Sequence, residues 1–131
     1  MAQGKALGVG GVFFKCKDSD ALGQWYKTTL GFDIEPTYGG ASFQHDKSPT
    51  GACTVWGPFK QDTEYFAPSE KPYMINLIVD DLDACLKQVE DHGGKLVGEP
   101  CEESYGRFAW FIDPEGNKIE LWQILNEGKF E

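Results

Sequence analysis

Residues 106–123 read Gly-Arg-Phe-Ala-Trp-Phe-Ile-Asp-Pro-Glu-Gly-Asn-Lys-Ile-Glu-Leu-Trp-Gln and hold two runs rich in aromatic and β-branched side chains. Between the runs, residues 113–116 place Asp first, Pro second and Gly fourth, which is typical of a tight turn. This pattern predicts a β-hairpin. Side chains alternate along a strand, so Lys118, Glu120 and Trp122 share one face of the second strand. Glu120 is therefore a carboxylate in the middle of a strand, on the same face as a tryptophan.

A chain of 131 residues with 40% hydrophobic residues suits one compact domain, or two small modules that share a core. Its 21 acidic and 12 basic residues give a net charge of −9. This charge repels phosphate groups, so we expect no nucleic-acid partner and no anionic membrane surface as partner. The N-terminus lacks the apolar core of a signal peptide, and no apolar run approaches the roughly 18 residues that span a bilayer. We therefore expect a cytoplasmic protein, with its four scattered cysteines reduced.

The first sixty residues predict a strand, a helix and three more strands. Residues 9–16 form a β-branched and aromatic run, and Asp18 after it is a typical helix cap. An amphipathic stripe then runs from Leu22 to Leu30, and Gly31 ends the helix. The segments 32–38, 41–45 and 53–59, separated by Gly and Pro turns, predict three antiparallel strands.

The second half repeats this order after residues 60–72, which have no clear period and predict a linker or an exposed loop. A strand at 73–79, a helix that Asp81 caps, a strand at 95–97 and the hairpin follow. Sliding one half by 63 or 64 places sets Gly11 on Met74 and Trp56 on Glu120. Each half is near the size at which one sheet and one helix are marginal alone, so we expect the halves to pair and bury their sheets.

Three motifs carry a resemblance to a known family: Phe13-Phe14-Lys15-x-Lys17-Asp18, Val79-Asp80-Asp81-Leu82, and Asp-Pro-Glu-Gly-Asn-x-Ile-Glu-Leu at 113–121. With them the chain resembles, over nearly its whole length, the vicinal oxygen chelate superfamily of glyoxalase I, bleomycin-resistance proteins and extradiol dioxygenases. The resemblance implies an α+β fold in which two paired βαβββ modules form a curled mixed sheet, with helices outside and a small-molecule site in the cup. The single domain would comprise module 1–60, linker 61–72 and module 73–131. The resemblance also implies a homodimer.

In metal-dependent members of this superfamily, four strands each supply one His, Gln or Glu to a divalent cation. The matching positions here are Gly11, Trp56, Met74 and Glu120. Only Glu120 carries a suitable ligand atom, and one carboxylate cannot replace the waters that a divalent cation loses. We therefore expect no metal ion, no other cofactor and no activity of the glyoxalase I kind.

Alternation from these four positions gives the cup an aromatic and apolar lining with a few polar groups, which is usual for an organic-ligand pocket. Phe13, Trp56 and Trp122 are placed to stack on a planar or cationic ligand, with Glu120 paired to its charge. Asn76 would orient the ligand, and Met74 completes the lining. The alternative is that these side chains simply fill the cup as core. An unpaired Glu120 would be costly in such a dry core.

Three functions remain open at this stage. The first is a metal-free protein that binds a small organic ligand. The second is a lyase or isomerase of the glyoxalase-related type, with Glu120 as a metal ligand or as the general base, since apolar surroundings make a carboxylate a better base. The third is an interaction module with a filled cup.

Two further side chains each keep two interpretations. Arg107, at a strand start, either reaches an anionic group of a ligand or forms a surface ion pair. Tyr65, beside the long loop, either closes over the cup or anchors the crossover between the modules.

Overall fold

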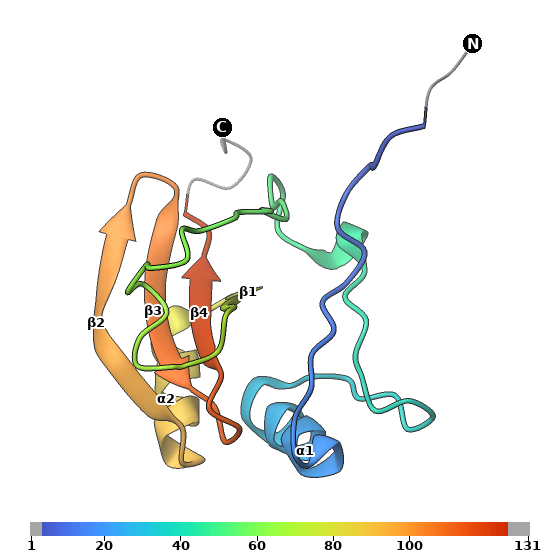
Figure 1. Ribbon diagram of the computed structural model, residues 1–131, viewed down its shortest axis with the longest axis vertical. Helices are drawn as coiled ribbons and strands as arrows, with labels where there is room; N and C mark the ends of the chain where they lie inside the picture. The colour runs from blue at the N-terminus through green and yellow to red at the C-terminus, as the bar shows by residue number, and fades with distance from the viewer. Residues whose placement is uncertain (1–3, 126–131) are drawn as a thin grey trace.

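The computed structural model describes residues 4–125 and shows two α-helices and one four-stranded sheet within that range (Figure 1). The predicted α+β class is confirmed. Neither α-helix is long and apolar enough to cross a membrane. In chain order the elements are α1 (Ser19–Leu30), the 3-10 helix η1 (His45–Lys47), β1 (Ile75–Ile78), α2 (Leu82–Asp91), β2 (Lys95–Glu103), β3 (Gly106–Ile112) and β4 (Lys118–Gln123).

Both α-helices begin at the predicted caps. The Asp18 carboxylate accepts a hydrogen bond from the backbone N–H of Ala21 at 3.0 Å, and Asp81 does the same for Ala84 at 3.0 Å. Each contact satisfies one of the N–H groups that a helix start leaves free. Gly31 ends α1 with a φ of 73°, a left-handed conformation that favours glycine.

The strands lie in the order β1-β4-β3-β2. The predicted hairpin is confirmed: β3 and β4 are antiparallel, and the N–H of Gly116 donates to the carbonyl of Asp113 at 3.0 Å across the turn. On the other side of β4, β1 runs parallel to it. Because β4 lies between β1 and β3, Glu120 has Trp110 opposite it on one neighbour and Asn76 beside it on the other.

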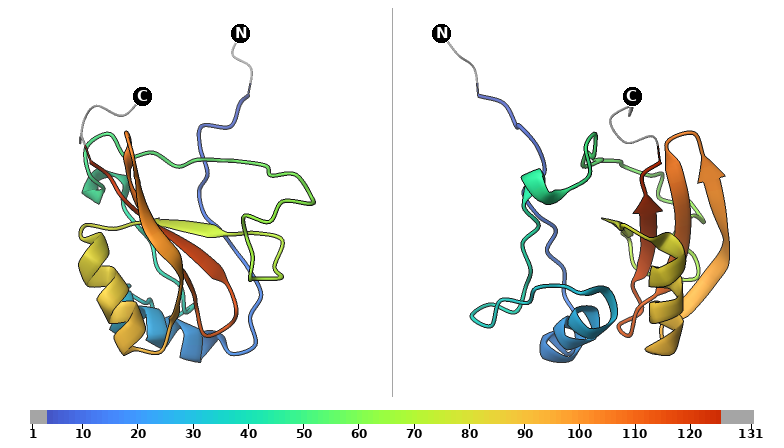
Figure 2. Two further views of the ribbon diagram at one scale, coloured as in Figure 1. Left: turned by 90° about the vertical axis from the view of Figure 1, so that its left-hand side faces the viewer. Right: turned by 180° about the vertical axis from the view of Figure 1, so that it is seen from behind.

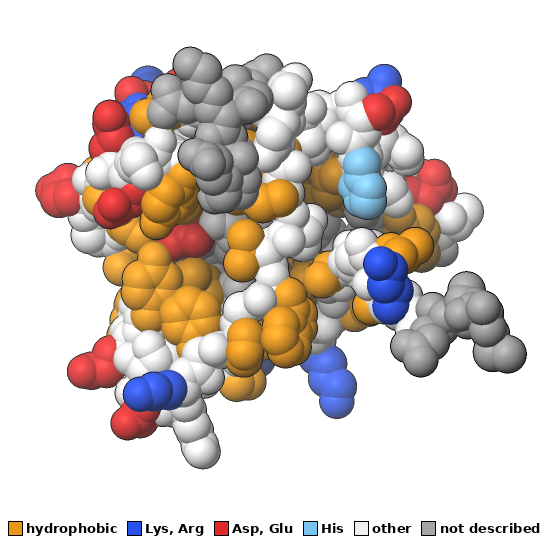
Figure 3. All heavy atoms as spheres, turned by 90° about the horizontal axis from the view of Figure 1, so that it is seen from above, with side chains coloured by type: hydrophobic (Ala, Val, Ile, Leu, Met, Phe, Trp, Pro, Cys, Tyr) orange, Lys and Arg blue, Asp and Glu red, His pale blue; other side chains and the backbone are white. Residues whose placement is uncertain are grey.

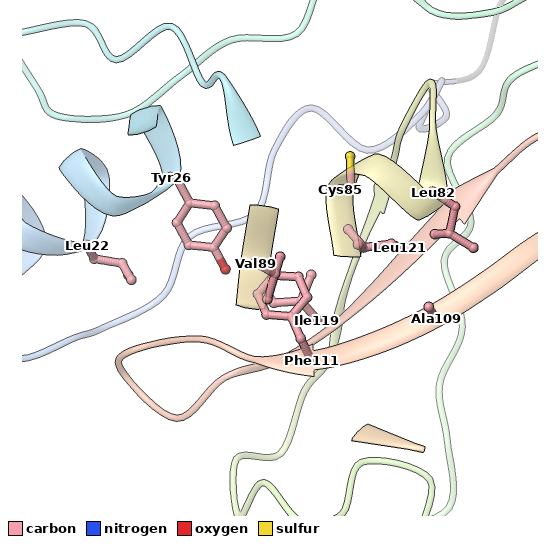
Figure 4. Packing of buried hydrophobic residues seen from close by; sticks show 9 residues of the cluster. All are labelled: Leu22, Tyr26, Leu82, Cys85, Val89, Ala109, Phe111, Ile119 and Leu121. Carbon is pink, nitrogen blue, oxygen red and sulfur yellow. The ribbon is translucent and has the colours of Figure 1, made fainter. Parts of the chain in front are cut away.

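The hydrophobic core lies between the helices and one face of this sheet (Figures 2 and 4). Phe111 and Leu121 from the sheet and Leu82 and Val89 from α2 are completely buried. The segment 60–72 crosses the opposite face of the sheet, as Figures 1 and 2 show. The full buried cluster consists of Leu22, Tyr26, Leu82, Cys85, Val89, Ala109, Phe111, Ile119 and Leu121.

The first half of the chain corrects one part of the prediction. None of the expected strands at 9–16, 32–38, 41–45 and 53–59 forms among the described residues. A strand persists only where a neighbour takes its backbone N–H and C=O groups, and glycine or proline within these segments, as at 57 and 58, weakens such pairing. All four strands of the sheet therefore come from the second half, and the sheet is not closed into a full cup.

Several large apolar side chains of the first half consequently face outward. Figure 3 shows exposed hydrophobic side chains across the middle of one face of the molecule. The exposed fraction is 96% for Phe13, 77% for Trp56 and 71% for Val55. The expected homodimer, in which a second copy would lie against such surfaces, stays a prediction.

Helix α1 nevertheless packs firmly on the second half. The Tyr26 hydroxyl donates to the Asp113 carboxylate at 2.9 Å, and the Trp25 indole N–H donates to the His92 carbonyl at 2.8 Å. Burial, reinforced by Asp113, raises the pKa of Tyr26 far above its usual value, so this hydroxyl remains a donor. The Glu115 carboxylate accepts from the backbone N–H groups that lead into α1. The first half is thus joined to the hairpin turn through its helix rather than through strands.

Candidate functional site

Glu120 is held by three hydrogen-bond donors on the sheet face opposite the helices. Its Oε1 accepts from the Asn76 side-chain amide at 2.8 Å. Its Oε2 accepts from the Trp110 indole N–H at 2.8 Å and from the Tyr65 hydroxyl at 2.6 Å. We call Glu120, Asn76, Trp110, Tyr65 and the adjacent Lys118 the Glu120 cluster. It joins residues from three strands and from the segment 60–72, so its geometry depends on the folded sheet.

The strand register explains why three of these side chains meet. Trp110 is the direct partner of Glu120 in the antiparallel hairpin, and Asn76 is its partner in the parallel pair. Side chains of directly paired residues project from the same face of a sheet with their Cβ atoms about 5 Å apart. A carboxylate on the central strand is therefore within reach of polar groups on both neighbouring strands.

Tyr65 reaches the cluster from the segment 60–72 and is fixed there by several contacts. Its carbonyl oxygen accepts from the Lys118 ammonium at 2.6 Å, and that ammonium lies 5.3 Å from the centre of its ring. Phe59 stacks on the ring with centroids 5.7 Å apart. The indole of Trp110 meets it edge to face at 6.3 Å. These contacts agree with both interpretations of Tyr65, because its side chain lies over this face of the sheet and also anchors the crossover segment.

Burial and charge set the protonation of the cluster. Burial, followed by the hydrogen bond to Glu120, raises the pKa of Tyr65 well above its usual value, which keeps the phenol protonated and donating. Burial lowers the pKa of Lys118, although the Glu120 charge opposes that shift. Lys118 is 7% exposed, so its ammonium depends on the Tyr65 carbonyl and on the aromatic rings beside it.

The cluster remains open to solvent from one side. Asn76 is exposed, Glu120 and Trp110 are half-buried, and Tyr65 is 42% exposed. A small molecule can therefore reach the Glu120 carboxylate if the Tyr65 side chain moves away from it. The arrangement combines one acceptor of full charge, an amide and several aromatic rings, which is the chemistry of an organic-ligand site.

The other predicted site residues of the second half, which are Trp122, Met74 and Arg107, are not members of the Glu120 cluster. Trp122 shares the face of Glu120 but is only 4% exposed; it stacks on Phe108 and donates its indole N–H to the Tyr105 carbonyl at 3.1 Å. Met74 is half-buried just before β1. Arg107 forms an ion pair with Asp83 of α2 at 3.1 Å, so the surface ion pair is the interpretation that the structure shows.

Phe13 and Trp56 are not brought to the cluster. Neither makes a hydrogen bond or ring contact with another residue of the 4–125 range, and both are largely exposed. The first half instead forms a shallow hollow of about 390 Å³ lined by Phe43, Gln44, His45 and Asp46, which shares no residue with the Glu120 cluster. Of the predicted site residues, Glu120 and Asn76 lie in the Glu120 cluster, and their role in ligand binding stays a prediction.

The sequence assigned no role to Trp110 or Lys118, and it placed Tyr65 at the cup without linking it to Glu120. Trp110 had a usable signal, because counting back from the turn at 113–116 pairs it with Glu120. Lys118 was placed on the correct face but given no role. For Tyr65 the sequence carries no such signal, since its position depends on how a loop far from β4 crosses the sheet.

The cluster does not fit a divalent metal ion. The groups around Glu120 are an indole N–H, an amide NH₂ and a phenol that donates, and an ammonium lies beside them. Cations need acceptor atoms, and these groups present hydrogen atoms or positive charge instead. Among residues 4–125 no three His, Cys, Asp or Glu side chains gather in a way that would hold an ion.

Comparison with known proteins places the fold in a family. A family model described as a glyoxalase-like domain matches residues 11–122. No curated protein matches the chain. The hypothetical protein SA1046 from S. aureus is 26% identical, but the match covers only 42% of this chain and 45% of that protein, with a TM-score of 0.38. This chain thus spans less than half the length of that neighbour.

Other solved structures match over most of their length. TnmS3, an antibiotic binding protein from Streptomyces sp. CB03234, is 26% identical, with 84% of this chain and 89% of that one covered and a TM-score of 0.51. A member of the glyoxalase/bleomycin resistance protein/dioxygenase superfamily from Sphaerobacter thermophilus DSM 20745 is 24% identical, with coverages of 91% and 98% and a TM-score of 0.51. The family match spans most of the sequence and includes both α-helices, β1, β2, β3 and all of β4 except Gln123, so this chain belongs to the glyoxalase-like domain family.

Proposed function

We propose that this protein binds a small, ring-bearing organic ligand at the Glu120 cluster, and that it does so without a divalent metal ion. The observation that carries the proposal is the set of three donors that hold Glu120 in place on an otherwise apolar and aromatic face. A carboxylate fixed in this way is a preorganised acceptor for a hydrogen-bond donor of the ligand. The similarity to TnmS3, an antibiotic binding protein, supports the same proposal.

Most lone pairs of Glu120 already accept hydrogen bonds, and this favours a binding role for Glu120 over a catalytic one. A carboxylate has about four acceptor positions, and three are used by Asn76, Trp110 and Tyr65. A general base needs a free position aimed at the substrate proton. The lyase or isomerase alternative would therefore rely on the single remaining position, whereas a binding protein can use either that position or the exchange of one donor for another.

The test is a titration of the full chain with indole, 4-methylbenzylamine and p-cresol, which each carry one donor group, and with N-methylindole and toluene, which carry none. Melting temperature and isothermal titration calorimetry are the readouts. We expect the donor compounds to bind better than the donor-free ones. Glu120→Gln should weaken binding by about fivefold, because hydrogen bonds to a charged acceptor are about 1 kcal/mol stronger than those to a neutral one.

Glu99→Gln on β2 is the matched control, because it makes the same change of charge at an exposed position. This variant should bind like the wild type, and treatment with EDTA should leave every affinity unchanged. If no compound binds, or if Glu120→Gln binds as well as the wild type, the proposal is wrong. Loss of binding in EDTA that zinc restores would contradict its metal-free part.

A further inference from the structure

The Tyr65 side chain occupies a position beside Glu120 that resembles that of a bound aromatic ligand. It is not part of the sheet, yet its hydroxyl takes the shortest of the three hydrogen bonds to Glu120, at 2.6 Å. The other two donors, Asn76 and Trp110, belong to strands paired with β4, so the sheet holds their backbones in place. Tyr65 is therefore the one of these three donors whose backbone can move away from Glu120 without breaking a strand pair.

The contacts around Tyr65 describe a site for an aromatic ring. Phe59 stacks on the ring at 5.7 Å, with only 24° between the two planes. Trp110 presents a perpendicular contact at 6.3 Å. Stacked and edge-to-face arrangements at these distances are the favourable ones for aromatic pairs. The ring is thus held by shape as well as by its hydroxyl group.

The charges of the site indicate which ring it prefers. The Lys118 ammonium lies 5.3 Å from the centre of the Tyr65 ring and 5.9 Å from that of Trp110. An electron-rich neutral ring is attracted by an ammonium at this distance. A cationic ring would be attracted by Glu120 but repelled by this ammonium, and for an anionic ring the signs are reversed, so neither charge is favoured by both groups. A neutral aromatic ring with a hydroxyl donor satisfies all of these groups at once.

We infer that the Glu120 cluster is a subsite for a phenol, which Tyr65 occupies until the phenolic hydroxyl of a ligand displaces it. This inference rests on the proposed function and names the chemical class of its ligand. The segment 60–72 then acts as a cover: ligand binding requires the hydroxyl of Tyr65 to leave Glu120. The ligand replaces that contact with an equivalent one, so the carboxylate does not lose a donor.

Competition by Tyr65 for the subsite lowers the affinity that is measured for a ligand of the wild type. A ligand that binds only the uncovered state has its affinity reduced by the fraction of molecules in that state. Removing the Tyr65 ring abolishes this competition and leaves a space of the shape of p-cresol between Phe59 and Trp110. Engineered apolar cavities do bind small rings of matching size.

The experiment measures p-cresol, 4-methylanisole and 4-methylbenzylamine against the full chain by calorimetry. Tyr65→Ala and Tyr65→Thr both free the space, and circular dichroism melting shows which of them are folded. We expect each folded variant to bind p-cresol at least about tenfold more tightly than the wild type. We expect 4-methylanisole, which has no donor, and 4-methylbenzylamine, which is cationic, to bind these variants at least about tenfold more weakly than p-cresol.

Two further variants serve as controls. Tyr65→Phe keeps the ring and should bind p-cresol within about threefold of the wild type, because the space stays filled. Tyr38→Ala removes an exposed tyrosine of the first half and should change nothing. The inference is wrong if the freed variants gain no affinity for p-cresol, if they bind 4-methylanisole equally well, or if Tyr38→Ala shows the same gain.

These outcomes separate the inference from the proposed function. If indole still binds the wild type in a way that depends on Glu120, but the freed variants gain nothing for p-cresol, the phenol subsite fails and the binding function stands. If no compound binds the wild type or any freed variant, both fail. If neither Tyr65→Ala nor Tyr65→Thr melts as a folded protein, Tyr65 is a structural residue and the idea of a displaceable cover is wrong.

Discussion

The two halves of this chain carry the same kinds of sequence signal but reach different structures. In each, an Asp cap and an apolar stripe give a helix. Runs of β-branched and aromatic residues occur in both, yet strands form only between residues 75 and 123 of the described chain. The difference shows that a helix is decided largely by local contacts, whereas a strand also needs a neighbour to pair with.

The hairpin turn explains why pairing succeeds in the second half. Asn117 is completely buried, and its backbone N–H donates to the Asp113 carboxylate at 3.0 Å, while the Asp113 N–H donates back to its carbonyl at 2.9 Å. The Tyr73 hydroxyl donates to the Asn117 side chain at 2.7 Å. This turn fixes the register of β3 against β4, and β1 and β2 then have an edge to join. Residues 35–40 of the first half also form a hydrogen-bonded turn, in which the Glu35 N–H donates to the Gly40 carbonyl at 2.8 Å and the Gly39 N–H donates to the Glu35 carbonyl at 2.7 Å. The segments on either side of that turn nevertheless do not pair as strands.

The largest expected effect contrasts a buried aromatic ring of the second half with an exposed one of the first half. Phe111→Ala removes a completely buried ring beneath α2 and should lower the free energy of unfolding by about 3–5 kcal/mol. Trp56→Ala removes a ring that is 77% exposed and should change it by no more than about 0.5 kcal/mol in dilute, monomeric protein. Urea denaturation followed by circular dichroism measures both.

A large loss in Trp56→Ala would contradict this contrast. If that loss depends on protein concentration, a second copy covers Trp56, and the two halves are equally ordered in the assembled protein. Analytical ultracentrifugation of the same samples would show whether the expected homodimer is present.

A smaller effect is expected from substituting two glycines, one of which is closely packed in the second half while the other lies in open space in the first half. Gly106 begins β3 with a φ of 155°, and a side chain there would press on the Trp122 indole and lie 2.8 Å from the Gln123 carbonyl oxygen. Gly106→Ala should therefore cost about 1–3 kcal/mol of stability. Gly10→Ala, in the first half, meets no atom within 4 Å and should be neutral. Equal melting temperatures for the two variants would show that the β2–β3 end of the sheet is looser than described.

The smallest effect concerns Glu115, which makes one of the contacts that join the two halves. Glu115 accepts from the backbone N–H groups of Lys17 and Asp18 at 3.0 and 2.9 Å, and these bonds lower its pKa below the usual value. A carboxylate with a lowered folded-state pKa stabilises the fold above the unfolded-state value of about 4.3, and this contribution is lost as the pH falls through the folded-state value. The melting temperature of Glu115→Gln should thus lie slightly below that of the wild type at pH 7, and the gap should close in acid.

Salt gives the control for this contact, because Glu115 is only partly buried and screening by salt weakens the interaction of its carboxylate. Adding 1 M NaCl at pH 7 should narrow the same gap. A gap that stays constant from neutral to acidic pH would mean that Glu115 acts through its shape rather than its charge.

Much of the fold could be predicted from the sequence because its signals were local. The caps at Asp18 and Asp81, the end at Gly31 and the turn at 113–116 each act within a few residues, and each is confirmed. Alternation also placed Glu120 on the opposite face of its strand from Ile119 and Leu121, which are buried in the core. The first-half strands were wrong because alternation reports only that a segment suits a sheet, and pairing depends on distant segments.

The site was less predictable for the same reason. Asn76 was assigned beside Glu120 through the repeat of the two halves, and the parallel register of β1 and β4 does bring them together. Phe13 and Trp56 were assigned through the first-half strands, which do not form. Tyr65 comes from a loop 55 positions away from Glu120 in sequence, and only the folded chain shows that it completes the cluster.

The most direct test of the Glu120 cluster uses the four tryptophans, because each indole N–H gives its own signal in a ¹H–¹⁵N spectrum. Single Trp→Phe variants assign the signals of Trp25, Trp56, Trp110 and Trp122, and p-cresol is then added to the labelled Tyr65→Ala protein. The account predicts that the Trp110 signal, whose hydrogen is bonded to Glu120, shifts in a saturable way, while that of Trp25, bonded to the His92 carbonyl, stays in place. A saturable shift of Trp56 or Trp25 with an unmoved Trp110 would contradict it.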